Sequence, residues 1–342
     1  MTPSFHPRLV NDRFGDPGVF VEILHRREAL LFDLGDLSPL STRDLLRVSH
    51  VFVTHGHIDH FIGFDALLRV LVGRDRIVEV VGPRGFADRV GHKLLGYQWD
   101  LVDRYETDLV FEVTELEADL TTRRARFRFK RGFAREDLGA GEAPDGLVAR
   151  GDGFCVRAAV LEHHGPSIGY AVEEPEHVNI WRNRLAERGL APGPWLQALK
   201  QAVIDRRGDA FPVETPDGVA SLGALREMLS VTPGQRVAYV TDVADTPGNR
   251  EAIAQLAGGA DLLFIESCFA AGDEAQAQAR AHLTTRAAGE IARAAGVRRV
   301  EPFHFSPRYE QGGADAMIAE VAAAFESQTR AGSRSESGAT AS

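Results

Sequence analysis

Short apolar runs rich in β-branched residues recur along the chain and alternate with segments of helical spacing. Helices are predicted at 61–72, 249–257, 284–295 and 314–326, where apolar residues recur every three or four positions. Strands are predicted at 19–24, 29–33, 50–54, 77–81, 156–161, 236–241, 261–266 and 300–304. Such alternation of strands and helices is typical of an α/β protein.

Many of these predicted strands end at or just before a polar residue that can bind metal or transfer protons. These residues are His55, His163, Asp242, Glu266 and His304. In α/β architectures, reactive groups gather beyond the carboxyl ends of the strands. The sequence therefore predicts that these side chains, although distant along the chain, meet in one site.

A basic segment interrupts this pattern. Residues 122–135 alternate arginine or lysine with phenylalanine, as in Arg126, Phe127, Arg128 and Phe129. At strand spacing, the alternation gives one basic face and one apolar face. The segment is either a phosphate-binding patch or an ordinary half-buried strand with a solvated basic face, and we favour the second interpretation.

A longer interruption covers residues 173–231. It is polar, is punctuated by proline and glycine, and contains two helical-looking stretches around the break APGP at 191–194. We predict a helical arm that protrudes from a catalytic domain spanning 1–325. The remaining residues, 326–342, are rich in serine, glycine and alanine and are predicted to be disordered.

Composition narrows the class of protein. The 342 residues are 44% apolar, enough for one large core or two modest ones. The net charge of −10 argues against a protein that coats nucleic acid uniformly, although a local basic patch remains open. The chain has only two cysteines and neither a leader-like apolar segment nor a membrane-length one. We therefore expect a soluble cytoplasmic protein with no membrane contact.

The strongest chemical signal is the stretch VFVTHGHIDHFIGF at 51–64. His55, His57, Asp59 and His60 lie within six positions, directly after an apolar run. In a tight turn, His55 and His57 can point the same way, while Asp59 and His60 open the next helix and reach a second position. Two such pairs suit two metal ions about 3.5–4 Å apart. Imidazole with carboxylate favours zinc, manganese or iron over calcium.

The segment T-H-G-H-I-D-H resembles the signature of the metallo-β-lactamase fold. More narrowly, the chain resembles the ribonuclease Z branch, the tRNA 3′-end endonucleases, from about residue 19 to 325. The resemblance implies a four-layer αββα sandwich. Further matching segments, in order, are LLFDLGD (30–36), LEHHGPSIGY (161–170), VTDVADTP (240–247), FIESCF (264–269), RAHLTTRAAGEIARAAG (280–296) and FHFSPRY (303–309).

The resemblance implies two divalent ions, with zinc foremost and Mn²⁺ or Fe²⁺ as alternatives. Asp242 would bridge the two ions, and Asp33 would lie behind their ligands. His163 rather than His164 would be a ligand, because it stands seven residues before Tyr170. The implied ligands are His55, His57 and His163 for one ion, and Asp59, His60 and His304 for the other.

The same residues suggest how hydrolysis would proceed. Two dications lower the pKa of a shared water, so that hydroxide is available at neutral pH. Asp59 could orient that water. His282, which is not needed as a ligand, could donate a proton to the departing oxygen, and Glu266 could hold His282 in the required tautomer. The alternative for His282 and Glu266 is a surface salt bridge near a helix start.

The predicted arm bears on the substrate. GLAPGPWLQALK (189–200) resembles the Gly-Pro-rich tip of the arm with which ribonuclease Z grips tRNA. Residues 180–207 carry six basic and two acidic side chains, a local charge of +4, although acids elsewhere in 173–231 cancel it. An arm that only faces solvent or builds a dimer is the alternative. The candidate substrate-binding residues are Arg182, Arg184, Arg188, Gly193, Pro194 and Lys200.

Two segments depart from the ribonuclease Z pattern. NDRFGDPGVFVEI replaces the usual glycine-rich opening F-L-G-T-G, and Gly63, Phe64 and Asp65 stand where G-L-P is usual. Neither change touches a ligand, but both could reshape the substrate rim.

Three functions are weighed. The resemblance implies a dinuclear metal-dependent phosphodiesterase, an endonuclease that removes the 3′ trailer of precursor tRNA and forms a homodimer. The alternative is a hydrolase of the same fold that acts on a small phosphodiester or another ester. A binding protein without turnover disagrees with the complete ligand set, because unused buried charges are costly. The predicted arm favours the first function.

Overall fold

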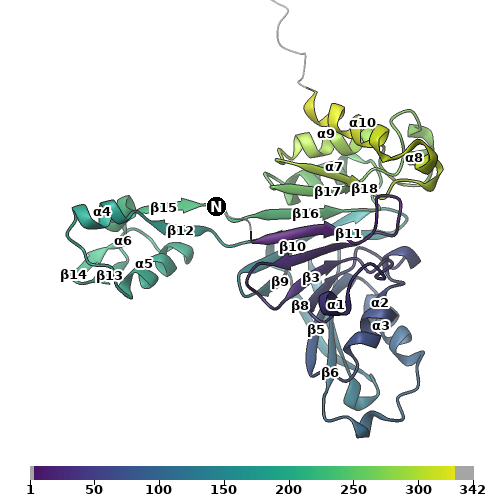
Figure 1. Ribbon diagram of the computed structural model, residues 1–342, viewed down its shortest axis with the longest axis horizontal. Helices are drawn as coiled ribbons and strands as arrows, with labels where there is room; N and C mark the ends of the chain where they lie inside the picture. The colour runs from purple at the N-terminus through teal and green to yellow at the C-terminus, as the bar shows by residue number, and fades with distance from the viewer. Residues whose placement is uncertain (1–3, 328–342) are drawn as a thin grey trace, which may run out of the picture.

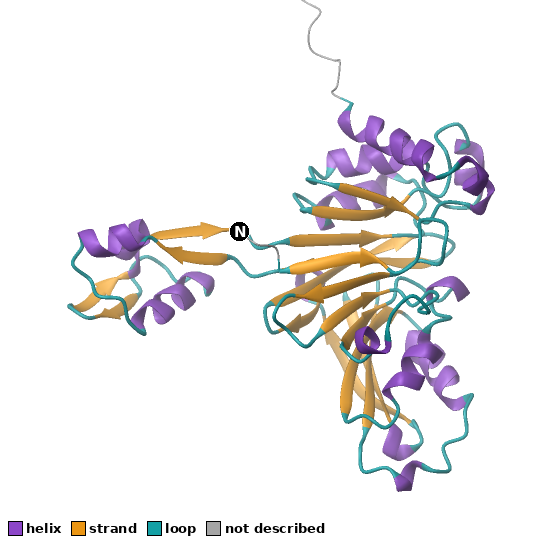
Figure 2. Cartoon of the chain, in the orientation of Figure 1, coloured by secondary structure: helices purple, strands orange, loops and turns teal. Residues whose placement is uncertain are grey.

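The computed structural model describes residues 4–327, so most of the tail predicted to be disordered lies outside the described residues. Two β-sheets pack face to face, and helices cover both outer faces (Figure 1, Figure 2). The predicted four-layer αββα sandwich is confirmed. Among the described residues, both cysteines are free and no helix is both long and apolar enough to cross a membrane.

The first sheet has eight strands in sequential order, and helices α1 (Thr42–Leu45), α2 (Phe64–Leu71) and α3 (Phe86–Leu95) follow its parallel strands. Strands β3, β4, β5 and β6 pair in parallel, which places their carboxyl ends at one edge. The strands are β1 (Phe5–Leu9), β2 (Val19–Ile23), β3 (Ala29–Phe32), β4 (Val48–Phe52), β5 (Arg76–Pro83), β6 (Leu109–Leu116), β7 (Thr121–Arg128) and β8 (Arg135–Glu142).

The second sheet has the order β18-β17-β16-β11-β10-β9, with β16, β17 and β18 parallel to one another. Its strands are β9 (Leu147–Gly151), β10 (Phe154–Glu162), β11 (Pro166–Glu173), β16 (Arg236–Val240), β17 (Leu262–Glu266) and β18 (Val300–Phe303). The helices that follow these strands are α7 (Pro247–Leu256), α8 (Glu274–Ala279), α9 (Thr285–Ala294) and α10 (Ala314–Glu326).

Strand β16 shows how the sequence builds the layers. Val237 and Tyr239 belong to the core between the two sheets, whereas Ala238 and Val240 belong to the core beneath α7, α9 and α10. Both faces of this strand are covered, so its sequence reads as a nearly continuous apolar run. A third core joins the first sheet to α2 and α3, and these three cores correspond to the three interfaces of a four-layer fold.

The arm is more than the predicted helical hairpin. Its stalk is a two-stranded ribbon of β12 (His177–Ile180) and β15 (Leu229–Thr232), which projects from the body in Figure 1. The head has its own apolar core, which includes Leu185, Leu199 and Leu222. It is built from α4 (Arg182–Glu187), α5 (Trp195–Ile204), β13 (Pro212–Thr215), β14 (Gly218–Ser221) and α6 (Leu222–Leu225).

Two local predictions need correction. Asp59 and His60 do not open helix α2, because Ile58–His60 forms a separate 3₁₀ turn and α2 begins only at Phe64. The basic strand ends at Arg128, where the next residues, Phe129–Arg131, form another 3₁₀ turn.

The basic face of β7 is neutralised by the neighbouring strand. Arg124 and Arg126 pair with Glu112 of β6 at 2.8 and 2.7 Å, and the aromatic ring of Phe127 is buried. The interpretation of this segment as a half-buried strand is therefore confirmed for residues 122–128.

Candidate metal centre

The turn after β4 is held in place by a close backbone approach. The amide of Leu34 donates to the carbonyl of His60, and the amide of Gly63 donates to the carbonyl of Leu34, both within 2.9 Å. A β-carbon on Gly63 would lie 2.1 Å from the carbonyl oxygen of Gly35, so only glycine fits there. The turn that carries the clustered histidines is thus fixed against the end of β3.

Three site residues immediately or closely follow strands and adopt left-handed backbone conformations. Asp33 follows β3 with φ 57°, Asp242 follows β16 with φ 49°, and His304 follows β18 with φ 56°. Such conformations cost energy in residues other than glycine and cluster at functional sites. In each case the turn directs the side chain out of its strand and toward the same edge of the sandwich.

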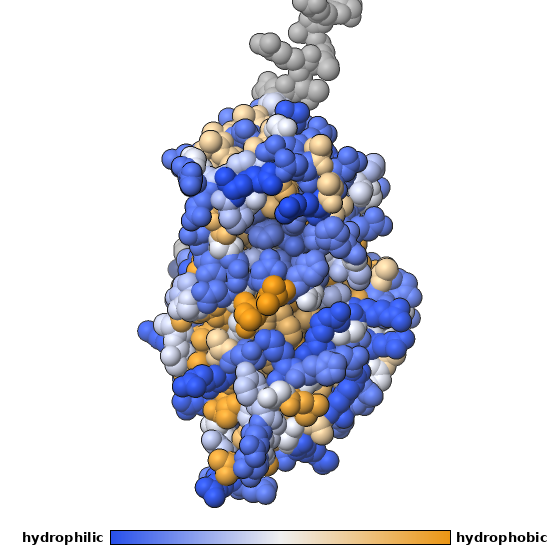
Figure 3. Space-filling view, turned by 90° about the vertical axis from the view of Figure 1, so that its right-hand side faces the viewer, coloured by the Kyte–Doolittle hydropathy of each residue, from blue (hydrophilic) through white to orange (hydrophobic). Residues whose placement is uncertain are grey.

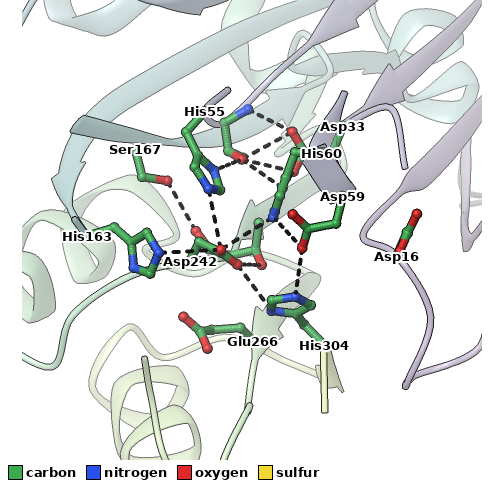
Figure 4. Close-up of polar contacts among 12 residues, drawn as sticks. Asp16, Asp33, His55, Asp59, His60, His163, Ser167, Asp242, Glu266 and His304 are labelled. Atoms are coloured by element: carbon green, nitrogen blue, oxygen red, sulfur yellow. Dashed lines mark hydrogen bonds and ion pairs between the residues drawn. The ribbon is translucent and has the colours of Figure 1, made fainter. Parts of the chain in front are cut away.

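Asp242 lies at the centre of the site (Figure 4). Its Oδ2 atom is 3.4 Å from Nε2 of both His55 and His60 and 3.6 Å from Nε2 of His163. Its Oδ1 atom is 3.1 Å from Nδ1 of His304. The predicted bridging carboxylate therefore faces four imidazoles contributed by three separate segments.

The opposite nitrogens of three imidazoles are anchored by the protein. His60 donates from Nδ1 to Asp33 at 2.8 Å, and His163 donates from Nδ1 to the carbonyl of Ala281 at 2.8 Å. Nδ1 of His55 lies 3.1 Å from the hydroxyl of Thr54. With Nδ1 engaged, each ring offers Nε2 to the centre, which is the usual way in which protein partners orient metal-binding histidines.

Several buried nitrogens of the centre have no hydrogen-bond partner among the described residues. They are His55 Nε2, His60 Nε2 and His304 Nδ1. Buried polar atoms without partners are rare in folded proteins, and an ion that they ligate resolves the deficit. The donor set of imidazoles and carboxylates also suits zinc, manganese or iron. The residues of this centre are therefore suited to bind divalent metal ions.

The seven predicted ligands form two groups. Within each group, the ligand atoms lie within 4.8 Å of one another. One group contains His55, His57, His163 and Asp242, and the other contains Asp59, His60 and His304. Asp59 joins the second group through contacts of 3.5 Å to His60 and 3.6 Å to His304. The structure thus brings together every residue for which the sequence predicted a ligand role.

His282 lies beside this centre and is oriented by a buried carboxylate. Its Nδ1 atom donates to Glu266 at 3.0 Å, and Glu266 is fully buried and also accepts the amide of Val243 at 2.7 Å. The imidazole is 4.9 Å from that of His163, measured between ring centroids. The surface salt bridge considered as an alternative does not describe this pair, because Glu266 has no exposure.

Two protein-family models and several relatives named ribonuclease Z match the chain. The model of the metallo-beta-lactamase superfamily matches residues 16–174, and that of the beta-lactamase superfamily domain matches 217–305. Ribonuclease Z of Deinococcus radiodurans is 30% identical over 304 residues, covering 86% of this chain and 88% of the relative. Ribonuclease Z of Thermobifida fusca is 32% identical over 304 residues, covering 86% and 80%.

The chain belongs to the ribonuclease Z family of the metallo-beta-lactamase superfamily. As a member, it is a metal-dependent hydrolase. Human tRNase Z, short form, has the same fold, with a TM-score of 0.52 at 19% identity over 90% of this chain and 92% of the human one. The unmatched residues between the two superfamily models lie within the arm.

Burial and neighbouring charges shift the pKa values of several side chains in this metal centre. Burial lowers the pKa of His55 to about 2. Burial would also lower that of His304, but Asp242 and Asp59 raise the pKa to about 10. Burial would raise the pKa of Asp242, yet His304 and His60 hold it well below its ordinary range. Without metal, protonated imidazoles therefore balance the central carboxylate.

Sequence reasoning missed three supporting residues. Thr54 donates its amide to Asp33 at 2.7 Å, Tyr239 donates its hydroxyl to Asp33 at 2.8 Å, and the hydroxyl of Ser167 donates to the carbonyl of Thr241 at 3.3 Å. The position of Thr54 directly before the histidine cluster was the only signal in the sequence. Tyr239 reads as an ordinary strand residue.

The centre opens into a cavity of about 530 Å³ that Phe14, Asp16 and Phe305 help to line. Phe14 and Asp16 belong to the atypical N-terminal segment, so this departure from the family pattern does reach the rim of the site.

The end of the sandwich opposite the arm is largely hydrophilic, with a small apolar patch near its middle (Figure 3). Ile58, in the histidine turn, is 76% exposed.

The candidate substrate residues of the arm are only partly brought together. Arg182, Gly193 and Lys200 line one groove of about 680 Å³ in the head. Pro194 is the N-cap residue directly before helix α5, and Arg188 pairs with Glu227 at 2.9 Å. The groove is distinct from the metal centre.

Proposed function

We propose that this protein is a dinuclear metal-dependent endonuclease that removes the 3′ trailer of precursor tRNA. One observation supports this above all: two groups of metal donors meet at Asp242, with the His282–Glu266 pair beside them. The relatives named ribonuclease Z and tRNase Z point to the tRNA substrate.

The proposed ions would be held in two adjacent positions. His55, His57 and His163 would bind one ion, Asp59, His60 and His304 would bind the other, and Asp242 would bridge them. Zinc is the proposed metal. Two such cations lower the pKa of a shared water and neutralise charge that develops on a phosphodiester.

The side chains around the ions would divide the remaining tasks. Asp59 is the most exposed carboxylate of the donor set, with 37% side-chain exposure against 4% for Asp242. It is therefore placed to accept a hydrogen bond from the attacking water and to orient it. His282, as an imidazolium, would donate its Nε2 proton to the departing oxygen, while Glu266 accepts Nδ1–H and stabilises the protonated ring.

The arm supports a long substrate and a homodimer. Its stalk joins the body just before β16 begins at Arg236, whereas Asp242 follows the end of that strand. Six residues of extended chain span roughly 20 Å, so the arm root and the metal centre lie at opposite ends of the sheet. Each arm points away from the metal centre of its own subunit. In a homodimer, the arm of one subunit would therefore grip a bulky substrate that reaches the metal centre of the other.

The deciding experiment is cleavage of a 3′-extended precursor tRNA by the zinc-reconstituted protein, with bis(p-nitrophenyl) phosphate assayed alongside. Cleavage near the discriminator base is the expected result. Turnover of the model diester without cleavage of the tRNA would retain the hydrolytic centre and overturn the proposed substrate.

A further inference from the structure

A second, smaller cavity adjoins the metal centre on one side. It measures about 220 Å³ and shares His57, His163 and His164 with the larger cavity. Arg84 and Arg89 line it as well. The two cavities thus lie next to each other at these histidines, with the metal donors lining the larger one and the two arginines lining the smaller one.

The formal charge of the lining reverses from the larger cavity to the smaller one. Three carboxylates, those of Asp16, Asp59 and Asp242, line the larger cavity together with one arginine, Arg280, so its formal charges are mainly negative. The smaller cavity has no carboxylate among its described lining residues, and its formal charges are those of the two arginines. On a chain with a net charge of −10, this reversal marks a local site for an anion.

Arg89 is held against the metal-binding turn. Its Nη1 atom donates to the carbonyl of Gly85 at 2.8 Å. A β-carbon on Gly56 would lie 2.6 Å from Arg89 Nε, so the arginine side chain rests directly on the residue between His55 and His57. Within residues 4–327, no carboxylate forms an ion pair with Arg89, and its remaining N–H groups are available to a ligand.

Arg84 is loosely tethered. Its Nε atom is 3.8 Å from Glu117, and its side chain is 73% exposed. An exposed ion pair of this length contributes little, so a stronger anion could displace it. Guanidinium groups match phosphate oxygens in a bidentate manner, and two of them beside one small cavity suit a phosphodiester anion.

We propose that Arg84 and Arg89 form a phosphate subsite that binds an internucleotide phosphate adjoining the scissile one in an RNA strand. This inference rests on the proposed function and deepens it. A phosphodiester with a single phosphate occupies the metal centre and leaves the arginine subsite empty. A polynucleotide occupies both, so the subsite selects an RNA strand over a small diester.

The test compares Arg89→Ala with Arg298→Ala, a matched control that removes the same charge. Arg298 pairs with Asp261 just before β17, at the opposite end of the sheet from the centre. Steady-state kinetics are measured on 3′-extended precursor tRNA and on bis(p-nitrophenyl) phosphate across a series of salt concentrations. For Arg89→Ala, we expect the ratio of kcat/KM for RNA to that for the diester to fall about tenfold, as for one lost charge-assisted contact.

A salt series adds a measurement that a purely structural role would not change. Losing one phosphate contact to a single strand should reduce the slope of log KM against log salt concentration by about 0.7. Arg89→Lys should restore part of the ratio, and Arg298→Ala should alter neither quantity. Arg84→Ala should repeat the effect of Arg89→Ala.

The outcomes separate the two proposals. An unchanged RNA-to-diester ratio and salt slope in Arg89→Ala, with RNA still cleaved, would overturn the subsite and leave the proposed function standing. Equal losses on both substrates would show that Arg89 supports the metal turn and would also overturn the subsite. A wild-type protein that hydrolyses only the diester would overturn the proposed function, and the subsite with it.

Discussion

The hydroxyl of Tyr239 donates to Asp33 at 2.8 Å across the interface between the two sheets, beneath the metal centre. Asp33 in turn accepts Nδ1–H of His60, so a phenol in the second sheet helps to orient a proposed ligand carried by the first. Burial raises the pKa of the Tyr239 hydroxyl well above its ordinary value, which keeps the proton available for donation.

Tyr239→Phe should therefore weaken metal binding without unfolding the protein. The substitution keeps the ring in the core and removes only the hydroxyl. Loss of such supporting hydrogen bonds typically costs about 10–100-fold in metal affinity. Zinc competition against a chromogenic chelator measures the change, and an affinity equal to that of the wild type would show that Asp33 orients His60 without help from Tyr239.

Asp242→Ala should lose both ions, because the carboxylate contacts histidines of both donor groups. The histidines would remain, but their shared anionic partner would not. Elemental analysis after gel filtration reports the metal content, and circular dichroism checks that the variant is folded. Full occupancy in a folded variant would contradict the bridging role.

The metal-binding turn and the strand-end residues could be predicted from the sequence, because their spacing places ligands where parallel strands end. Other features could not. Tyr239 and Asp33 are 206 positions apart, and only the facing of the two sheets brings them together. The arm strands, such as Pro212–Thr215, are four residues long and polar, so they carry little period-two signal. Helix α3, which carries Arg89, was not predicted.

His282→Ala should retain both ions yet slow turnover by about 10²–10⁴-fold, the usual contribution of a positioned general acid. Burial would lower the pKa of His282, but Glu266 raises it overall. Glu266→Gln should therefore move the alkaline limb of the kcat profile to lower pH. Unchanged kinetics in His282→Ala would remove its proposed role.

The metal-free protein should lose stability between pH 7 and pH 10. His304 has a pKa near 10 in the fold against 6.5 ordinarily, so its favourable charge is fully present below pH 6.5 and is lost as the pH rises through about 10. Thermal unfolding in chelator measures this loss, and His304→Gln should show a smaller decline over the same range. Parallel curves for the two proteins would contradict the assigned shift.

Replacing the arm head should separate recognition of tRNA from hydrolysis. Ile180 and Leu229 are paired across the antiparallel stalk, so an Asn-Gly turn can join them and replace residues 181–228. The head has its own core, and the body keeps its three cores without it. We expect kcat/KM for precursor tRNA to fall at least tenfold relative to that for bis(p-nitrophenyl) phosphate.

A matched variant keeps the head folded and changes only its charge. Arg182 and Lys200 line the arm groove and form no ion pair with any described residue, so Arg182→Glu with Lys200→Glu reverses charge without breaking a salt bridge. If the groove binds phosphates, this variant should reproduce the loss on tRNA and flatten its salt dependence. Equal loss on both substrates in the shortened protein would instead make the arm a structural element.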